Sequence, residues 1–219
     1  MSKKQYVVIG LGRFGTSIAE TLYNLGNDVL VVDNDEDRIQ SIVNNVTHAI
    51  QADATDEIAL REVGVRNFDV AIVSIGADIQ ASIMATILLK ELGVKVVVTK
   101  ANNAMHAKVL KKIGADKVVF PEKDMGIRVA HGLAYSNILE YIELSPDYSL
   151  AEFLCPRDWS NKTLKESDVR SKFGINVIAI KREDGVDVSP IADDIISKTD
   201  VIVAIGSIED LNKLENNMN

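Results

Sequence analysis

A glycine-rich turn near the N-terminus constrains the fold of this chain more than any other stretch. The hexapeptide Gly10-Leu11-Gly12-Arg13-Phe14-Gly15 directly follows residues 6–9, an apolar run that is typical of a buried parallel strand. After the hexapeptide, apolar residues recur at helical spacing until Gly26, a residue type that commonly ends a helix. We therefore expect the hexapeptide to form the turn between a strand and a helix.

The glycine spacing also predicts that this turn binds a nucleotide. Gly10 can adopt a tight backbone conformation, Gly12 lets the backbone approach a pyrophosphate, and Gly15 lets the helix pack near the strand. The N–H groups of the first helical turn and the helix dipole favour a negative group at this position. The next apolar run, 29–32, ends at Asp33, where a ribose-binding carboxylate is expected. The joint pattern favours nucleotide binding over a merely structural turn.

Short apolar runs alternate with helical segments as far as residue 120. This pattern predicts an α/β fold of the Rossmann type, a doubly wound parallel sheet of six strands with helices on both faces. Ligands bind such sheets at the C-terminal ends of the strands. The predicted site residues at those ends are Gly10, Leu11, Gly12, Arg13, Phe14, Gly15, Asp33, Asn34, Asp53, Ala54, Thr55, Ser74, Ile75, Gly76, Lys100 and Glu122.

The pattern changes after Pro121. A helix is predicted from Asp124 to Leu139, with more apolar faces than a solvated helix would carry. A small α+β unit follows, which includes a hairpin with its turn at Asp184-Gly185. We therefore expect a nucleotide-binding domain at 1–122, a crossover or interface helix at 123–140, and a second domain at 141–219. The second domain has no obvious catalytic cluster.

Composition excludes several classes of protein. The 219 residues carry a formal net charge of -8, which argues against a broad surface for nucleic acid or anionic lipid. The single Cys155 cannot form an intrachain disulfide, and no apolar run approaches the length that crosses a bilayer. We expect a cytoplasmic protein that inserts into no membrane and reaches one only through a partner.

Several separate motifs occur in a fixed order along the chain. They are the hexapeptide 10–15, Gln51-Ala52-Asp53-Ala54-Thr55, Ile75-Gly76 with Gln80-Ala81-Ser82, Ile113-Gly114-Ala115-Asp116, Pro121-Glu122-Lys123-Asp124-Met125-Gly126, Ser189-Pro190, Asp194-Ile195-Ile196 and the run 200–206. Together these motifs resemble the RCK (regulator of potassium conductance) family, and within it the KtrA or TrkA type. The resemblance covers nearly the whole chain, and its second half resembles the TrkA-C module.

The resemblance implies a non-enzymatic regulatory subunit of a cytosolic gating ring. In this family, dimers of RCK units assemble into an octameric ring that docks on a membrane potassium channel of the KtrB or TrkH type. ATP and ADP compete for the N-terminal site, with NAD(H) expected to bind more weakly. The resemblance also implies that Arg13 senses the phosphates and that Glu122 contributes to a Mg²⁺ or Ca²⁺ site between neighbouring subunits.

The resemblance implies a second ligand, cyclic di-AMP, at a dimer interface of the C-terminal domain. Arg170 and Asn176 match positions that contact its phosphates and bases, and an arginine beside a side-chain amide suits a phosphate-linked purine. The segment could also be an ordinary junction between a helix and a strand. The residues expected at the cyclic di-AMP site are Val169, Arg170, Ile175, Asn176, Val177 and Pro190.

The sequence leaves two interpretations open for several residues of the N-terminal site. Asp33 could cap the next helix instead of binding ribose, and so could Asp53 instead of lying beside adenine. Lys100 could contact a phosphate or be a solvated surface lysine. Arg13 could likewise be a solvated arginine, and Glu122 an ordinary exposed glutamate. The Rossmann pattern alone would also suggest a small NAD-dependent oxidoreductase or a free-standing NAD(H) redox sensor. Against the oxidoreductase, no acid–base or hydride-transfer constellation is recognisable after Glu122.

Overall fold

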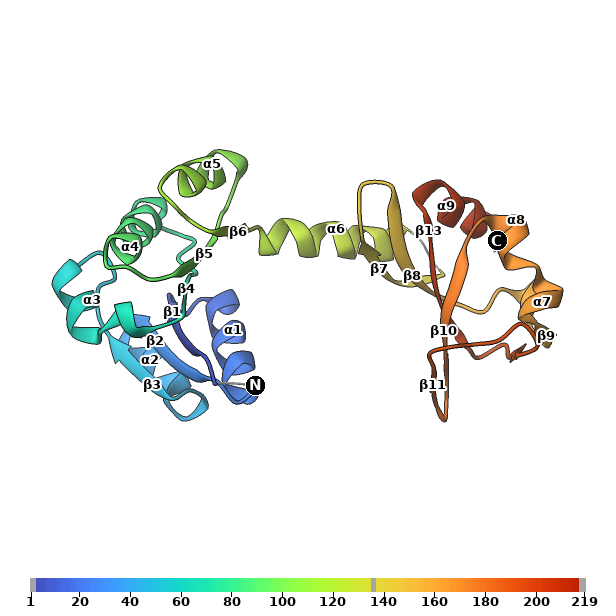
Figure 1. The fold of residues 1–219 in the computed structure, drawn as a ribbon, viewed down its shortest axis with the longest axis horizontal. Helices are drawn as coiled ribbons and strands as arrows, with labels where there is room; N and C mark the ends of the chain where they lie inside the picture. Colours follow the sequence, from blue (N-terminus) through green and yellow to red (C-terminus); the bar gives the residue numbers. More distant parts are fainter. Residues whose placement is uncertain (1–2, 135–136, 217–219) are drawn as a thin grey trace. The chain divides into compact units, whose positions relative to one another are not determined.

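A computed structural model describes residues 3–134 and 137–216. The chain divides into two compact units, Met1–Glu122 and Lys123–Asn219. Helix α6 (Pro121–Ala134) begins at the end of the first unit and continues into the second (Figure 1). No helix in the described part of the chain combines the length and the apolar character needed to cross a bilayer.

The first unit is built on a six-stranded parallel sheet with the strand order β3-β2-β1-β4-β5-β6. This order is the one found in Rossmann folds, and it confirms the predicted doubly wound sheet. The order reverses between β1 and β4, so a crevice is expected at their carboxyl ends. The strands are β1 (Gln5–Ile9), β2 (Asp28–Asp33), β3 (His48–Gln51), β4 (Val70–Val73), β5 (Val96–Lys100) and β6 (Lys117–Val119).

Helices cover both faces of this sheet (Figure 1). Val7 of β1 belongs to a core cluster with Leu60 and Leu89, whereas its neighbour Val8 belongs to a separate cluster with Ile39. Successive strand residues therefore face different helix layers, which explains why the strands are apolar without interruption. The helices are α1 (Arg13–Asn24), α2 (Glu36–Ile42), η1 (Val43–Asn45), α3 (Glu57–Val63), η2 (Val65–Asn67), α4 (Ile79–Glu91) and α5 (Ala104–Lys112).

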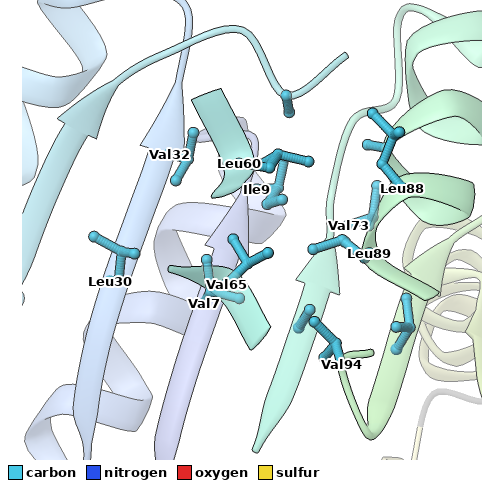
Figure 2. Packing of buried hydrophobic residues seen from close by; sticks show 14 residues of the cluster. Val7, Ile9, Leu30, Val32, Leu60, Val65, Val73, Leu88, Leu89 and Val94 are labelled. Atoms are coloured by element: carbon cyan, nitrogen blue, oxygen red, sulfur yellow. The ribbon is translucent and has the colours of Figure 1, made fainter. Parts of the chain in front are cut away.

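The first of these clusters joins β1, β2 and β4 to α3, η2 and α4. Figure 2 shows Ile9 and Val32 of the strands beside Leu60 of α3, and Val73 of β4 beside Leu88 of α4. These side chains are almost completely buried, at up to 6% exposure. Burying one such side chain contributes about 1.5–3 kcal/mol, so this packing holds the strand ends in place beneath the glycine turn.

The second unit contains a five-stranded antiparallel sheet with the order β11-β10-β13-β8-β7. A small two-stranded sheet pairs β12 with β9 in the same unit. This confirms a small α+β domain. Its elements are β7 (Ile138–Glu143), β8 (Tyr148–Leu154), η3 (Arg157–Trp159), β9 (Lys162–Thr163), α7 (Leu164–Ser167), α8 (Val169–Phe173), β10 (Asn176–Arg182), β11 (Gly185–Asp187), β12 (Ile195–Ile196), β13 (Val201–Ser207) and α9 (Ile208–Asn216).

An aromatic cluster lies in the core of the second unit. The ring of Trp159 meets the ring of Phe153 edge-on, with centroids 5.9 Å apart, and lies 5.8 Å from the ring of Phe173. Trp159 is buried, and it joins η3 to the sheet and to α8. The second unit thus has a hydrophobic core of its own, formed by residues after Glu122.

Two local predictions differ from the structure. The helix predicted to reach Leu139 ends at Ala134, and Leu139 belongs to strand β7; residues 135–136 of that prediction lie outside the described part. The hairpin is confirmed, but Arg182 pairs with Gly185, so its turn residues are Glu183 and Asp184. Strand pairing overrides local propensity in both cases, because β7 and β11 gain ladder hydrogen bonds from β8 and β10.

Candidate functional site

A cleft of about 570 Å³ opens at the carboxyl ends of the parallel strands, where the strand order reverses. It is lined by all of the predicted site residues of the first unit except Leu11 and Gly15. The strand ends therefore converge as the sequence predicted. The additional lining residues are Ile9, Val32, Arg38, Ala52, Ala77, Asp78, Ala81 and Asn102.

The glycine turn forms one wall of the cleft. Gly10 has a φ of 92°, a left-handed conformation that favours glycine. A Cβ on Gly15 would overlap the carbonyl oxygen of Gly10 and lie 2.6 Å from the hydroxyl oxygen of Ser74. A Cβ on Gly12 would meet no atom within 4 Å. Gly15 is thus required for packing, whereas Gly12 leaves open space in front of the first turn of α1.

Three predicted residues support this wall from behind. The hydroxyl of Ser74 donates a hydrogen bond to the carbonyl oxygen of Gly10 at 3.0 Å, which ties β4 to the turn. The side chain of Leu11 is buried and packs in the core cluster of α1 and α2. Gly15 is also buried, beneath the turn. Leu11 and Gly15 therefore shape the turn without lining the cleft.

Asp33 lies at the end of β2 and is only 6% exposed. One carboxylate oxygen, Oδ2, accepts a hydrogen bond from the backbone N–H of Leu11 at 2.5 Å, and Oδ1 accepts one from the N–H of Asp35 at 2.9 Å. The guanidinium of Arg38 lies 3.6 Å from Oδ2. Asp35, not Asp33, caps α2, so the interpretation of Asp33 as a helix cap is wrong. Asp33 is held rigidly in the cleft as a negative hydrogen-bond acceptor.

Asp53 and Thr55 lie just after β3, on the same side of the cleft as Asp33. Oδ1 of Asp53 accepts hydrogen bonds from the backbone N–H and the hydroxyl of Thr55, both at 2.8 Å. These two bonds lower the pKa of Asp53, so its side chain stays ionised at neutral pH. Asp56 caps α3, so neither Asp53 nor Thr55 serves as the helix cap. Both side chains are left to shape the wall of the cleft.

Charged groups gather at the β5 end of the cleft. The ammonium Nζ of Lys100 lies 2.5 Å from Oε1 of Glu122, in the first turn of α6. The hydrogen bond from Lys100 lowers the pKa of Glu122, and the positive charge of Arg13 adds to this shift. The side chain of Lys100 is only 13% exposed, so it is not a solvated surface lysine. Two cations and one carboxylate thus meet at this end.

The sequence prediction missed three polar residues that line the cleft. Arg38 comes from α2, Asp78 caps α4 by accepting a hydrogen bond from the N–H of Ala81, and Asn102 follows β5. The amide of Asn102 donates a hydrogen bond to the carbonyl oxygen of Gly76. Asp78 lies two residues after Gly76, and Asn102 lies two residues after Lys100, both of which were predicted strand-end positions. This nearness in the sequence could have indicated both residues.

A metal site formed by this chain alone finds no support in the described residues. Nowhere among them do three or more histidine, cysteine, aspartate or glutamate side chains gather closely enough to hold a metal ion. Glu122 offers one carboxylate, which is already paired with Lys100. Any cation at Glu122 would therefore need most of its ligands from a bound phosphate or from another chain.

Comparison with known proteins identifies both halves of the chain. The model of the TrkA-N domain matches residues 6–121, and that of the TrkA-C domain matches residues 150–219. The chain belongs to the TrkA type of the RCK family. Its fold is also similar to that of the GsuK channel, with a TM-score of 0.70 and 16% identity over all of this chain and 40% of the channel chain. That likeness concerns the fold alone.

Two relatives in this RCK family match almost end to end. The Ktr system potassium uptake protein C of Bacillus subtilis is 47% identical over 213 residues, which cover 97% of this chain and 96% of the relative. The Ktr system potassium uptake protein A of the same organism is 44% identical over 216 residues, or 99% and 97% of the two chains. The RCK resemblance drawn from the motifs is therefore confirmed.

The C-terminal segment expected to bind a second ligand is partly a core element of this RCK chain. Arg170 of α8 and Asn176 of β10 are exposed, and Val177 and Pro190 are partly exposed. Val169 and Ile175, in contrast, are buried at 4% and 0% exposure in the core of the second unit. We therefore correct one expectation: Ile175, named above among the residues of the cyclic di-AMP site, offers no exposed apolar surface to a ligand, because its side chain packs inward.

Proposed function

We propose that the chain is a non-enzymatic regulatory subunit of a Ktr-type potassium uptake system, and that its N-terminal cleft binds ATP and ADP. The charge arrangement along the cleft is the observation that carries this proposal. Asp33 offers a buried carboxylate for ribose hydroxyls, and the opposite end gathers Arg13, Lys100 and Glu122. A nucleotide with its ribose at Asp33 directs its phosphates over the turn at Gly12 toward these cations.

The same charges favour a phosphate-terminated ligand over NAD(H). Guanidinium and ammonium groups bind phosphate oxygens strongly, whereas a nicotinamide ring offers no comparable negative charge. Arg13, at the first position of α1, is well placed to respond to the number of phosphates. A regulatory switch requires a ligand with different affinities for two states, and the terminal phosphate of ATP supplies such a difference.

A divalent cation, Mg²⁺ or Ca²⁺, accompanies ATP in this proposal. Such ions are commonly held by one or two carboxylates together with phosphate oxygens. Glu122 would supply a carboxylate oxygen, and the ion would neutralise the negative charge of the phosphates. The remaining ligands come from the nucleotide or from a neighbouring subunit.

The proposed partner is a membrane potassium channel of the KtrB type, which an octameric ring of these chains contacts from the cytoplasm. The names of the Bacillus subtilis relatives support a role in potassium uptake. Helix α6 supports self-association, since its apolar side chains Met125, Val129 and Leu133 are exposed. Apolar groups exposed along one helix favour burial against another subunit.

We also propose that cyclic di-AMP binds the C-terminal domain between two copies of the chain. The exposed guanidinium of Arg170 and the exposed amide of Asn176 support this second site. Gly174 lies between them with a φ of 71°, which turns the chain sharply from α8 into β10. Val177 and Pro190 supply partly exposed apolar surface, while Val169 and Ile175 position the segment from within the core.

Calorimetric titration of the full chain with ATP, ADP, NADH and cyclic di-AMP tests these proposals. We expect ATP and ADP to bind more tightly than NADH, and Arg13→Ala to narrow the difference between ATP and ADP. Asn176→Ala is expected to weaken cyclic di-AMP binding and to leave ATP binding unchanged. Tight NADH binding with substrate-dependent turnover would instead make the chain an oxidoreductase.

A further inference from the structure

The pair formed by Lys100 and Glu122 joins two structural elements with different roles. Lys100 is the last residue of β5, in the rigid parallel sheet, whereas Glu122 is the second residue of α6. Their 2.5 Å contact lies in the lining of the cleft. Helix α6 continues from this contact into the second compact unit. A ligand that changes the contact therefore acts directly on the helix that leaves the nucleotide-binding unit.

Lys100 is held in place by its surroundings. Its ammonium lies so close to the backbone of Gly76 that a Cβ on that residue would stand 3.1 Å from Nζ. Asn102 donates a hydrogen bond to the carbonyl oxygen of Gly76 and so braces the same stretch. The Lys100 side chain is 13% exposed, while that of Glu122 is 64% exposed. Glu122 is therefore the partner that can move into solvent when the pair separates.

We propose that the Lys100–Glu122 ion pair is a latch on the first turn of α6, and that the terminal phosphate of a bound nucleotide opens it by taking Lys100 from Glu122. The proposal deepens the proposed function and rests on nucleotide binding in this cleft. A phosphate oxygen and the Glu122 carboxylate compete for one ammonium. More phosphates favour the open latch, because their negative charge extends further toward Lys100.

The energetics allow a ligand to operate such a latch. A pair in which one partner is largely exposed contributes little to stability, because solvent screens it. The hydrogen bonds that a phosphate accepts from a charged donor are stronger than those between neutral groups. A phosphate can therefore displace Glu122 at low cost, and Arg13 lies close enough for its charge to influence the same carboxylate.

Titration with AMP, ADP and ATP in the presence of a chelator tests the latch without any divalent cation. In Glu122→Gln, Lys100 has no competing carboxylate, so ATP is expected to bind about twofold to fivefold more tightly than in the unchanged chain. AMP affinity is expected to change less than ATP affinity. If Glu122 acted only as a cation ligand, its replacement would leave ATP affinity in chelator unchanged, and this result would overturn the latch.

A double variant separates the latch from simple repulsion by Glu122. Lys100→Met is expected to weaken ATP binding more than AMP binding. In the Lys100→Met background, Glu122→Gln is expected to bring no further gain, because the competition has been removed. A gain of equal size in both backgrounds would show direct repulsion and overturn the latch. Lys90→Met is the matched control, since Lys90 pairs with Asp116 at 3.0 Å outside the cleft lining.

A spectroscopic readout follows the latch itself. In ¹³C NMR spectra, the signal of the Glu122 side-chain carboxyl carbon is expected to shift when ATP is added in the presence of chelator. The signal is assigned by its absence from the spectrum of Glu122→Gln. The same addition to Lys100→Met is expected to leave it in place. If ATP binds the unchanged chain without shifting the Glu122 signal, the latch is refuted, whereas the proposed function stands. A chain that binds no adenine nucleotide would refute the latch and the proposed function together.

Discussion

The carboxylate of Asp33 accepts a hydrogen bond from the backbone N–H of Leu11, 22 residues earlier in the chain, at 2.5 Å. This bond joins the end of β2 to the glycine turn after β1. The other carboxylate oxygen accepts the N–H of Asp35. The residue that we propose to bind ribose is therefore also the residue that holds the turn in position.

Asp33→Asn is expected to destabilise the first unit as well as to weaken nucleotide binding. An asparagine has one acceptor oxygen, so one of the two N–H groups would face an amide NH₂. An unsatisfied buried donor costs about 1–3 kcal/mol, which urea unfolding measures directly. The control is Asp53→Asn, because Asp53 is exposed and, among the described residues, its carboxylate accepts hydrogen bonds from Thr55, two residues later in the chain. An equal loss of stability in both variants would contradict this account of Asp33.

The two later glycines of the hexapeptide are expected to differ in the effect of an added methyl group. Gly15→Ala places a Cβ against the carbonyl of Gly10 and the hydroxyl of Ser74. Overpacking of this kind costs about 1–3 kcal/mol and more where the backbone must move. Gly12→Ala adds its Cβ to open space at the mouth of the cleft.

Thermal unfolding and ATP titration distinguish the two glycine variants. Gly15→Ala is expected to lower the melting temperature and to lose ATP binding through the distorted turn. Gly12→Ala is expected to keep its melting temperature and to lose ATP affinity, because the methyl group occupies the path of the phosphates. Normal ATP affinity in Gly12→Ala would contradict the proposed path.

Acidification is expected to destabilise the first unit through His106. This residue is 3% exposed, and in the described part of the chain its Nε2 has no hydrogen-bond partner. Burial lowers the pKa of His106 from its ordinary value of 6.5, so the folded state favours the neutral ring. The unfolded chain then binds the proton more readily, and stability is lost as pH falls below about 6.5.

Urea unfolding at pH 7.5 and pH 5.5 measures this effect. His106→Gln is expected to reduce the loss of stability between the two pH values, whatever its effect at pH 7.5. His48→Gln, which changes an exposed histidine, is expected to keep the full loss. The pKa values of Asp53, Asp116 and Glu122 are lowered in the folded state. The stability that these carboxylates contribute is therefore lost only at a pH more acidic than that at which His106 takes up its proton. The same pH dependence in His106→Gln as in the unchanged chain would exclude His106 as its source.

Trp159→Ala is expected to unfold the second unit selectively. Loss of a buried aromatic side chain that contacts Phe153 and Phe173 costs about 3–5 kcal/mol. The first unit has separate core clusters, so ATP affinity should persist. Trp159 is the only tryptophan, and its fluorescence reports unfolding of the second unit in the unchanged chain. Parallel loss of ATP binding in Trp159→Ala would show that the first unit depends on the core of the second.

The sequence predicted most of the first unit because its signals are local. A strand that is buried on both faces must be apolar at every position, and the glycine spacing specifies the turn that follows β1. The ends of successive parallel strands meet at one edge, so Asp33, Ser74 and Lys100 could be placed near the hexapeptide. The strand order confirms this placement.

The end of α6 and the orientation of Ile175 could not be predicted in this way. Leu139 carries an apolar side chain at helical spacing, but it lies in β7, where its neighbours Ile138 and Glu140 pair with β8. Ile175 stands between the exposed residues Gly174 and Asn176, yet its side chain packs in the core with Ile202 and Leu211. Both outcomes depend on contacts with residues far along the chain, which local periodicity does not record.

By itself, the sequence determined the type of fold, the position of the glycine turn and the family, because each depends on residue types at fixed spacing along the chain. Only the tertiary structure decided which charged groups meet. Arg38 lies beside Asp33, and Lys100 pairs with Glu122, 22 residues later. Such pairs depend on the order of the strands in the sheet and on the directions in which side chains leave them. For that reason the cleft could be predicted as a nucleotide site, while its latch came from the structure.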